Sequence, residues 1–269
     1  MFGAVIGDIV GSRFEFHNHK SKNFRLFDRA NGSRFTDDTV MTLAIAQSLL
    51  DTLSNPHQSS LQVLADTAVS RMREFGIKYL NVGYGHKFKA WITSPNPAPY
   101  GSFGNGSAMR ISPVGLAARD VPEAKSLAKA VTEITHNHPE GLKAAEAVAV
   151  AMVLAKAGCS LKEIKDYVTV HYYAIDFTLD EIRPTYHFTS SAKNSVPQAF
   201  EAFFESIDFE DAIRNAVSIG GDSDTIAAIV GGLAEAYYGV PTGLAKEAEK
   251  FLDNEQKRIV REFEHLMDK

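Results

Sequence analysis

The chain has 269 residues, 45% of them hydrophobic and 23% charged, which is typical of a globular protein large enough to bury a sizeable core. Its net charge of −5 argues against general nucleic-acid binding and membrane-surface binding, because both need a basic surface. The single cysteine, Cys159, excludes an intrachain disulfide and a cysteine-based zinc site. Since there is no signal peptide and no apolar run of about 20 residues, we expect a soluble, cytoplasmic protein without a membrane partner.

Apolar residues recur with a helical period along nearly the whole chain, and alternating β patterns are scarce. Only residues 167–177 leave a strand open as an alternative. Ser160 and Asp208 precede two of the predicted helices as starter residues, and Gly158 follows another as a terminator. Because no repeat or linker divides the chain, we predict an all-α fold with residues 1–269 forming a single domain. Besides an N-terminal helix, the predicted helices cover residues 40–50, 61–72, 123–134, 140–157, 161–168, 198–206, 209–218, 226–238 and 244–267.

The N-terminal helix carries a stripe of glycines, with Gly3, Gly7 and Gly11 at every fourth position. This spacing does not match the dinucleotide-binding fingerprint, and no strand precedes it. Small residues on one face of a helix favour close packing against another helix, so we expect this helix at the centre of the bundle. Residues 16–34 follow as a long, basic loop.

Two acidic clusters, Thr36-Asp37-Asp38-Thr39 and Asp222-Ser223-Asp224-Thr225, each come directly before an apolar run of helical period. One interpretation is that they only cap the helices and complement their dipoles. The second cluster, however, follows Gly220-Gly221 and crowds four oxygen-bearing side chains into one turn, whereas a cap needs one. Two such helix ends facing each other would form a cage of hard oxygen ligands, which suits Mg²⁺ or Mn²⁺.

Glu15, after the glycine-striped helix, supplies a further carboxylate to this candidate site. Five carboxylates brought together without a cation would repel one another, and their pKa values would rise. Two divalent cations would nearly cancel that charge, and paired metal ions are a recurring hydrolytic device. The sequence therefore predicts a site for two divalent cations.

A third motif is the glycine-rich segment Gly101–Arg110, whose glycines free the backbone to turn its N–H groups toward an anion. It would suit a diphosphate, and because it lacks the lysine of a P-loop it does not indicate triphosphate hydrolysis. A plain connecting loop is the alternative, which Asn105 and Arg110 make less attractive as well-placed polar groups. His136 could contact a ribose or a phosphate, although a lone histidine at a helix boundary is more often structural.

Taken in chain order, these motifs resemble the ADP-ribosylglycohydrolase family, and the resemblance covers nearly the entire chain. It implies a compact, orthogonal all-α bundle with a dimetal site, usually of magnesium or manganese, that hydrolyses the bond between ADP-ribose and its acceptor. The residues that carry it are Gly3-Ala4-Val5-Ile6-Gly7-Asp8, Glu15, Phe35-Thr36-Asp37-Asp38-Thr39, Gly101 to Arg110, Thr135-His136 and Gly220-Gly221-Asp222-Ser223-Asp224-Thr225.

The resemblance also implies a role for individual residues. One ion would be held by Thr36, Asp37, Asp38 and Asp224, and the other by Asp222, Asp224 and Thr225, with Asp224 bridging the two. Glu15 and Asp37 are the candidates for catalytic acid or base. The substrate-binding residues would be Gly101, Ser102, Phe103, Gly104, Asn105, Gly106, Met109 and His136.

The partner implied is an ADP-ribose-containing substrate, either an ADP-ribosylated protein or an ADP-ribosylated small molecule. The acceptor, the choice between Mg²⁺ and Mn²⁺ and the oligomeric state stay open at this point. Two alternatives are a metal-dependent phosphohydrolase, which would release AMP, and a non-catalytic ADP-ribose-binding module. The complete set of acids argues against the binding module. We expect residues 167–196 to help shape the mouth of the substrate site.

Overall fold

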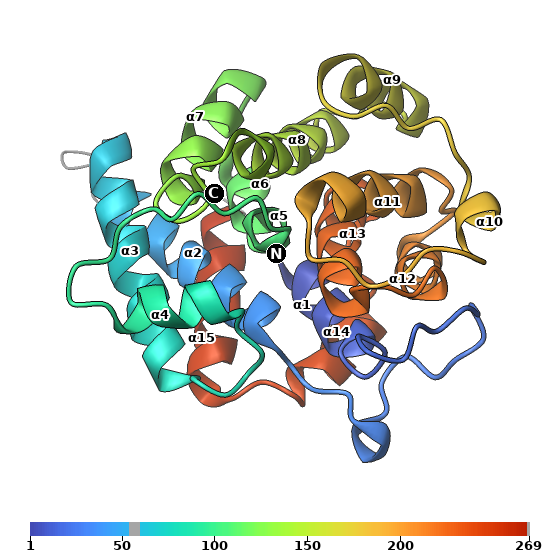
Figure 1. Ribbon diagram of the computed structural model, residues 1–269, viewed down its shortest axis with the longest axis horizontal. Coiled ribbons are helices and arrows are strands. Elements are labelled where there is room, and N and C mark those ends of the chain that lie inside the picture. Colours follow the sequence, from blue (N-terminus) through green and yellow to red (C-terminus); the bar gives the residue numbers. More distant parts are fainter. Residues whose placement is uncertain (54–59, 268–269) are drawn as a thin grey trace.

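The computed structural model describes residues 1–53 and 60–267, and within them no strand forms. A single isolated bridge joins Gly104 to Ser191. The all-α prediction is therefore confirmed (Figure 1). The helices are α1 (Phe2–Gly11), α2 (Asp37–Leu53), α3 (Leu61–Lys78), α4 (His86–Thr93), α5 (Gly106–Met109), α6 (Ser112–Ala117), α7 (Val121–Thr132), α8 (Pro139–Lys156), α9 (Leu161–His171), α10 (Leu179–Ile182), α11 (Ala192–Phe204), α12 (Phe209–Ser218), α13 (Ser223–Tyr238), α14 (Thr242–Glu249) and α15 (Asn254–Met267), with the 3₁₀ turn η1 (Arg29–Asn31) between α1 and α2.

The central feature of the bundle is the contact between α1 and α13, which lie side by side near the middle of the view in Figure 1. Every residue of α1 is buried. A Cβ atom added to Gly7 would lie 1.9 Å from the carbonyl oxygen of Ala227. One added to Gly11 would lie 2.4 Å from the carbonyl oxygen of Ser223. The two backbones therefore touch, and the glycine stripe serves helix packing, as the sequence indicated.

The other helices are arranged around this pair. The helices α8, α11 and α12 pack against α13, and α2 contacts both members of the pair. The last two helices return to the first two, because α14 contacts α1 and α15 contacts α2. Segments from both ends of the chain thus meet at the same core, which is where the two acidic clusters were expected to face each other.

Several predicted helix boundaries are confirmed. The Ser160 hydroxyl accepts a hydrogen bond from the Glu163 backbone N–H and forms a capping box at the start of α9. The Asp208 carboxylate accepts from the Asp211 N–H at 2.7 Å and starts α12. Gly158 follows α8 with a φ of +84°, the left-handed conformation that favours glycine. Residues 167–177 contain the end of α9 and no strand.

One helix prediction is wrong, because residues 244–267 form two helices instead of one. The chain leaves α14 after Glu249 and restarts at Asn254. At the restart, the Asp253 carboxylate accepts from the Gln256 N–H at 3.0 Å, while the Gln256 side chain accepts from the Asp253 N–H at 3.0 Å. This reciprocal cap begins a new helix within an apolar pattern that reads as continuous.

The segment between α1 and α2 forms the long connection expected for residues 16–34, interrupted only by η1. It is tied to the start of α13, because the Asn18 side-chain oxygen accepts from the Gly221 N–H at 3.2 Å. Gly220 and Gly221 have φ values of +70° and +77°, which accounts for the glycine pair before Asp222. Among the described residues, no helix combines the length and the apolarity needed to cross a membrane.

The α1–α13 contact predicts that Gly7→Ala strongly destabilises the protein, because the new methyl group would overlap the backbone of Ala227. We expect the free energy of unfolding to fall by about 3 kcal/mol or more, as for severe overpacking of a core. Urea denaturation followed by circular dichroism measures this difference.

The matched control is Gly243→Ala in α14, where an added Cβ atom would meet no atom within 4 Å. This change should leave stability unchanged or raise it by up to about 1 kcal/mol, because alanine is the better helix residue. A Gly7→Ala protein as stable as the wild type would contradict the backbone contact.

Candidate metal and substrate site

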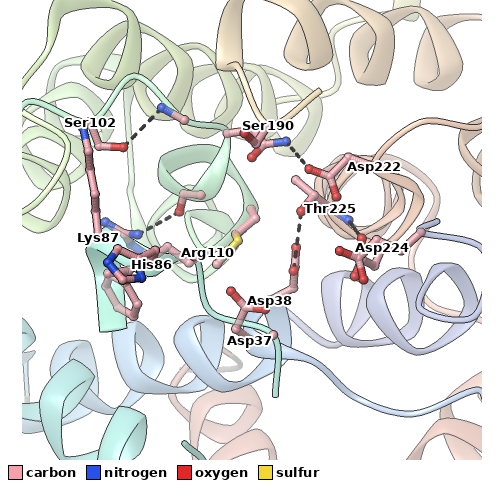
Figure 2. A pocket seen from close by; sticks show the side chains of 18 of the residues that line it. Asp37, Asp38, His86, Lys87, Ser102, Arg110, Ser190, Asp222, Asp224 and Thr225 are labelled. Carbon is pink, nitrogen blue, oxygen red and sulfur yellow. Dashed lines mark hydrogen bonds between the residues drawn. The ribbon is translucent and has the colours of Figure 1, made fainter. Parts of the chain in front are cut away.

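The acidic ends of α2 and α13 face each other beside the C-terminal end of α1, as Figure 2 shows for Asp38 and Asp224. Two groups of three carboxylates result, and within each the ligand oxygens lie within 4.8 Å of one another. The first group is Asp8, Asp38 and Asp224, and the second is Glu15, Asp222 and Asp224. Asp224 belongs to both groups, which is the position that a bridging ligand requires.

The two threonines predicted as ligands lie among these carboxylates. The Thr36 hydroxyl is 2.7 Å from Asp8 Oδ1 and 3.2 Å from Asp38 Oδ2. The Thr225 hydroxyl is 3.5 Å from Asp38 Oδ2. Both threonines are buried, so their oxygen atoms are available only to groups inside the site.

Asp37 differs from its neighbour Asp38 because it lies outside both carboxylate groups and is only half-buried. Its carboxylate faces the substrate pocket described below. Gly83, with a φ of +123°, passes directly over it, and a Cβ atom there would lie 2.7 Å from Asp37 Oδ1. Glu15 is half-buried as well and lines the same pocket. The two candidate acid–base residues are therefore the more accessible carboxylates of the site.

Asp8 is a member of the site that sequence reasoning missed. Its carboxylate accepts hydrogen bonds from the Thr36 N–H at 2.8 Å, the Thr36 hydroxyl at 2.7 Å, the Thr39 N–H at 3.0 Å and the Thr39 hydroxyl. A residue of α1 thus caps the first turn of α2. The sequence carried a signal for it, since Asp8 is the one charged residue in the apolar run from Phe2 to Val10.

Burial raises the pKa values of all six carboxylates, and repulsion by neighbouring carboxylates adds to this for Glu15, Asp37, Asp38 and Asp224. Burial, followed by the charge of Asp222, raises the pKa of Glu15 to about 7. Burial, followed by the charge of Asp8, raises the pKa of Asp37 to about 8. The same causes hold the pKa values of Asp38 and Asp224 well above their usual range. Such a cluster is stable in its ionised form only with a counter-charge.

The chemistry of these donors fits hard divalent cations. All of them are carboxylate or hydroxyl oxygens, which Mg²⁺ and Mn²⁺ prefer. Asp38 Oδ1 is buried and has no hydrogen-bond partner within the described part of the chain, which leaves a ligand position open. The residues present therefore fit the predicted dimetal site.

A cavity of about 490 Å³ opens beside the carboxylates. Most of the predicted substrate residues line it. These are Ser102, Gly104, Asn105, Gly106, Met109 and His136. Gly101 and Phe103 do not line it: the Gly101 N–H donates to the Asn137 side chain at 2.7 Å, and the half-exposed Phe103 ring lies edge-on against His138.

Some backbone N–H groups of the glycine-rich loop already donate hydrogen bonds within the protein. The Gly104 N–H donates to the Ser102 hydroxyl at 3.3 Å, and the Asn105 N–H donates to the Ser190 carbonyl at 2.8 Å. The N–H groups of Gly106 and Ser107 have no acceptor among the described residues. The Asn105 side chain donates to Asp222 Oδ2 at 2.8 Å, which joins the loop to the acidic end. The loop thus keeps two adjacent backbone donors for an anion.

His136 is held in place by hydrogen bonds that run from Arg110 through the Thr135 hydroxyl. Arg110 Nη2 donates to the Thr135 hydroxyl at 2.7 Å, and that hydroxyl lies 2.8 Å from His136 Nδ1. Arg110 Nη2 also lies 3.4 Å from His136 Nδ1, and because the arginine can only donate, Nδ1 accepts and the proton of the neutral ring is on Nε2. Burial, and then the charge of Arg110, lowers the pKa of His136. Nε2 lies 3.4 Å from a Cβ position on Gly106, so a neutral donor faces the loop.

Several further residues line the cavity that the sequence did not single out, among them Phe16, His86, Lys87 and Phe188. Phe188 and the neighbouring Ser190 come from residues 167–196, as expected for the segment that shapes the mouth. His86 and Lys87 begin α4. No spacing in the sequence links α4 to the acidic clusters, so its place in the site depends on the fold alone.

A family model described as ADP-ribosylglycohydrolase matches residues 1–265. ADP-ribosylhydrolase ARH3 of Xenopus tropicalis is 26% identical over 95% of this chain and 91% of its own length. The ADP-ribosyl-(dinitrogen reductase) glycohydrolase of Rhodospirillum rubrum is 27% identical over 96% of this chain and 92% of its own. A solved structure described as an ADP-ribosylglycohydrolase-related protein complex superposes with a TM-score of 0.69 at 23% identity, over 99% of this chain and 95% of that one. The last match confirms the fold.

The raised pKa values predict how stability depends on pH in the metal-free protein. The folded-state pKa values of about 7 for Glu15 and about 8 for Asp37 exceed the usual values of about 4 for free carboxyls. Their protonation therefore favours the folded state, and this contribution is complete below about pH 4 and lost as the pH rises to about 8. With EDTA, we expect the Tm to fall between about pH 5 and pH 8.5.

Saturating Mg²⁺ should reduce that fall, because the cation binds the folded state and replaces the protons as counter-charge. Scanning calorimetry across this pH range, with and without Mg²⁺, measures both effects. A Tm in EDTA that stayed level or rose with pH would contradict the raised pKa values of Glu15 and Asp37.

Proposed function

This chain belongs to the ADP-ribosylglycohydrolase family, and from that premise we propose that it is a two-metal hydrolase that releases ADP-ribose from an ADP-ribosylated acceptor. The observation that carries the proposal is the meeting of the acidic ends of α2 and α13 at one end of a cavity whose other walls include the glycine-rich loop. A substrate with a ribose at one end and a diphosphate next to it matches that arrangement.

The proposed ligands are Thr36, Asp37, Asp38 and Asp224 for one ion and Asp222, Asp224 and Thr225 for the other. The shared position of Asp224 supports a bridging role. Asp8 would support the first site by orienting Thr36, since its own oxygens already accept several hydrogen bonds. When bound, two Mg²⁺ or Mn²⁺ ions act as Lewis acids toward the ribose hydroxyls and the attacking water.

The chain's own carboxylates would do two things for the reaction. Cleaving the glycosidic bond builds positive charge on the ribose ring, and carboxylates held nearby stabilise that charge. Glu15 and Asp37 are the proposed acid and base, because they are the most accessible of the carboxylates that line the cavity. One would give a proton to the leaving acceptor atom and the other would take a proton from water.

The diphosphate would lie along the glycine-rich loop. The N–H groups of Gly106 and Ser107 are free to donate, and His136 Nε2 supplies a third neutral donor nearby. Ser102, Gly104, Asn105 and Met109 would complete this wall. Gly101 and Phe103 stay predictions for the same end of the substrate. The partner we propose is an ADP-ribosylated protein or small molecule.

We also propose that residues 1–269 act as one domain in the cytoplasm. The packing of α14 and α15 on α1 and α2 supports a single folding unit, because neither end of the chain has a core of its own. The lone cysteine, Cys159, suits a reducing compartment.

Product analysis by mass spectrometry tests this function. The protein would be given ADP-ribosylated arginine, ADP-ribosylated serine and ADP-ribosylated nucleic-acid ends, each with Mg²⁺, with Mn²⁺ and with EDTA. We expect intact ADP-ribose as the product, no activity in EDTA, and a loss of at least about 100-fold for Asp224→Asn, since even residues behind a metal ligand cost 10- to 100-fold.

Asp180→Asn is the matched control, because it removes a carboxylate from an 87% exposed side chain in α10. It should keep full activity. Release of AMP would replace this function with a phosphohydrolase, and tight ADP-ribose binding without turnover would replace it with a binding module.

A further inference from the structure

Arg110 is a buried cation that has no carboxylate partner among the described residues. Its side chain is 1% exposed, and its guanidinium donates only to the Gly106 carbonyl at 2.8 Å, the Thr135 hydroxyl at 2.7 Å and His136 Nδ1 at 3.4 Å. Its Nε is buried and has no acceptor among the described residues. Buried arginines are almost always paired with an anion, because an isolated buried charge is costly. The missing anion is therefore expected from outside the chain.

Lys87 is a second cation on the wall of the same cavity. Its side chain is exposed, and within the described ranges it makes no hydrogen bond and no ion pair. In Figure 2, Lys87 and Arg110 lie on the side of the pocket away from Asp222 and Asp224. The cavity thus has a basic part and an acidic part, and Lys87 does not neutralise the site's own carboxylates.

The charges match one part of the proposed substrate. A diphosphate that links two riboses carries two negative charges, and Lys87 and Arg110 supply two positive ones. Burial lowers the pKa of Arg110 to about 10, so its guanidinium is still charged at neutral pH. The free N–H groups of Gly106 and Ser107 point to the same ligand group, since backbone donors of this kind bind phosphate oxygens.

We propose that Lys87 is a substrate-binding residue that pairs with the diphosphate of the ADP-ribose group, with Arg110 as the buried second counter-charge. This inference rests on the proposed function. Lys87 supplies from α4 the lysine that the glycine-rich loop lacks. An ammonium–phosphate contact is charge-assisted and partly exposed, so it strengthens substrate binding and weakens with salt.

The test is direct binding of ADP-ribose and of ADP by calorimetry in Mg²⁺, which needs no turnover. For Lys87→Gln we expect the Kd for both ligands to rise by about tenfold or more, the effect of losing a hydrogen bond to a charged group. Raising the salt from about 50 to about 300 mM should weaken binding by the wild type more than by Lys87→Gln. In kinetics, the KM should rise with kcat within about twofold, because the contact is not specific to the transition state.

Lys89→Gln is the matched control, because Lys89 lies on the same helix, is exposed and does not line the cavity. Its Kd should equal that of the wild type, and Lys87→Arg should keep most of the affinity. Lys87 and Lys89 are both exposed, so these substitutions do not disturb the core. A substitution of the buried Arg110 could prevent folding.

Three results would overturn the proposal: equal affinities of Lys87→Gln and wild type, an equal loss in Lys89→Gln, or a wild-type protein that binds neither ligand. Wild-type binding without hydrolysis would instead count against the proposed function alone. In that case the ratio of Kd values between Lys87→Gln and wild type still decides the role of Lys87.

Discussion

The direct backbone contact between α1 and α13 is the constraint on which the site depends. Because the glycines of α1 let the two helices touch, Gly11 lies against Ser223 and Asp224, and the C-terminal end of α1 meets the N-terminal end of α13. Glu15 follows α1 and Asp222 precedes α13, so this register brings the second carboxylate group together. A larger side chain in the stripe would separate the helices and spread those carboxylates apart.

Gathering the carboxylates has an electrostatic cost. Burial raises the pKa values of six carboxylates in one region, and repulsion adds to this for four of them, which opposes folding of the ionised cluster unless it is offset. Part of the offset is internal, because Asp8 is satisfied by the first turn of α2 and Asp222 by Asn105. Asp38 Oδ1 has no such partner in the described part of the chain. The negative charge that these bonds do not offset favours the binding of cations at the site.

The features that the sequence predicted correctly are those encoded by local pattern. Helical periodicity, the caps at Ser160 and Asp208 and the glycine stripe all act within one or two turns of helix, so they can be read from neighbouring residues. The features it missed need the fold. Asp8 acts on a helix about 30 residues away, and Lys87 reaches the cavity only because α4 packs against α3. The break before α15 is local, but the apolar pattern that runs through it masks the reciprocal cap.

Capping alone does not account for the two acidic clusters, because Asp8 of α1, and not Asp37 or Asp38, caps α2, and the Asp222 carboxylate makes no capping bond. Asp222 occupies the N-cap position of α13, yet its side chain makes no capping bond and instead accepts from Asn105. At the start of α2, the N–H groups of Thr36 and Thr39 donate to Asp8 from another helix. The carboxylates of Asp37 and Asp38 are therefore not needed to cap α2. Carboxylates held at helix ends but not used for capping are available for a ligand, and this division of roles favours a functional site over a structural one.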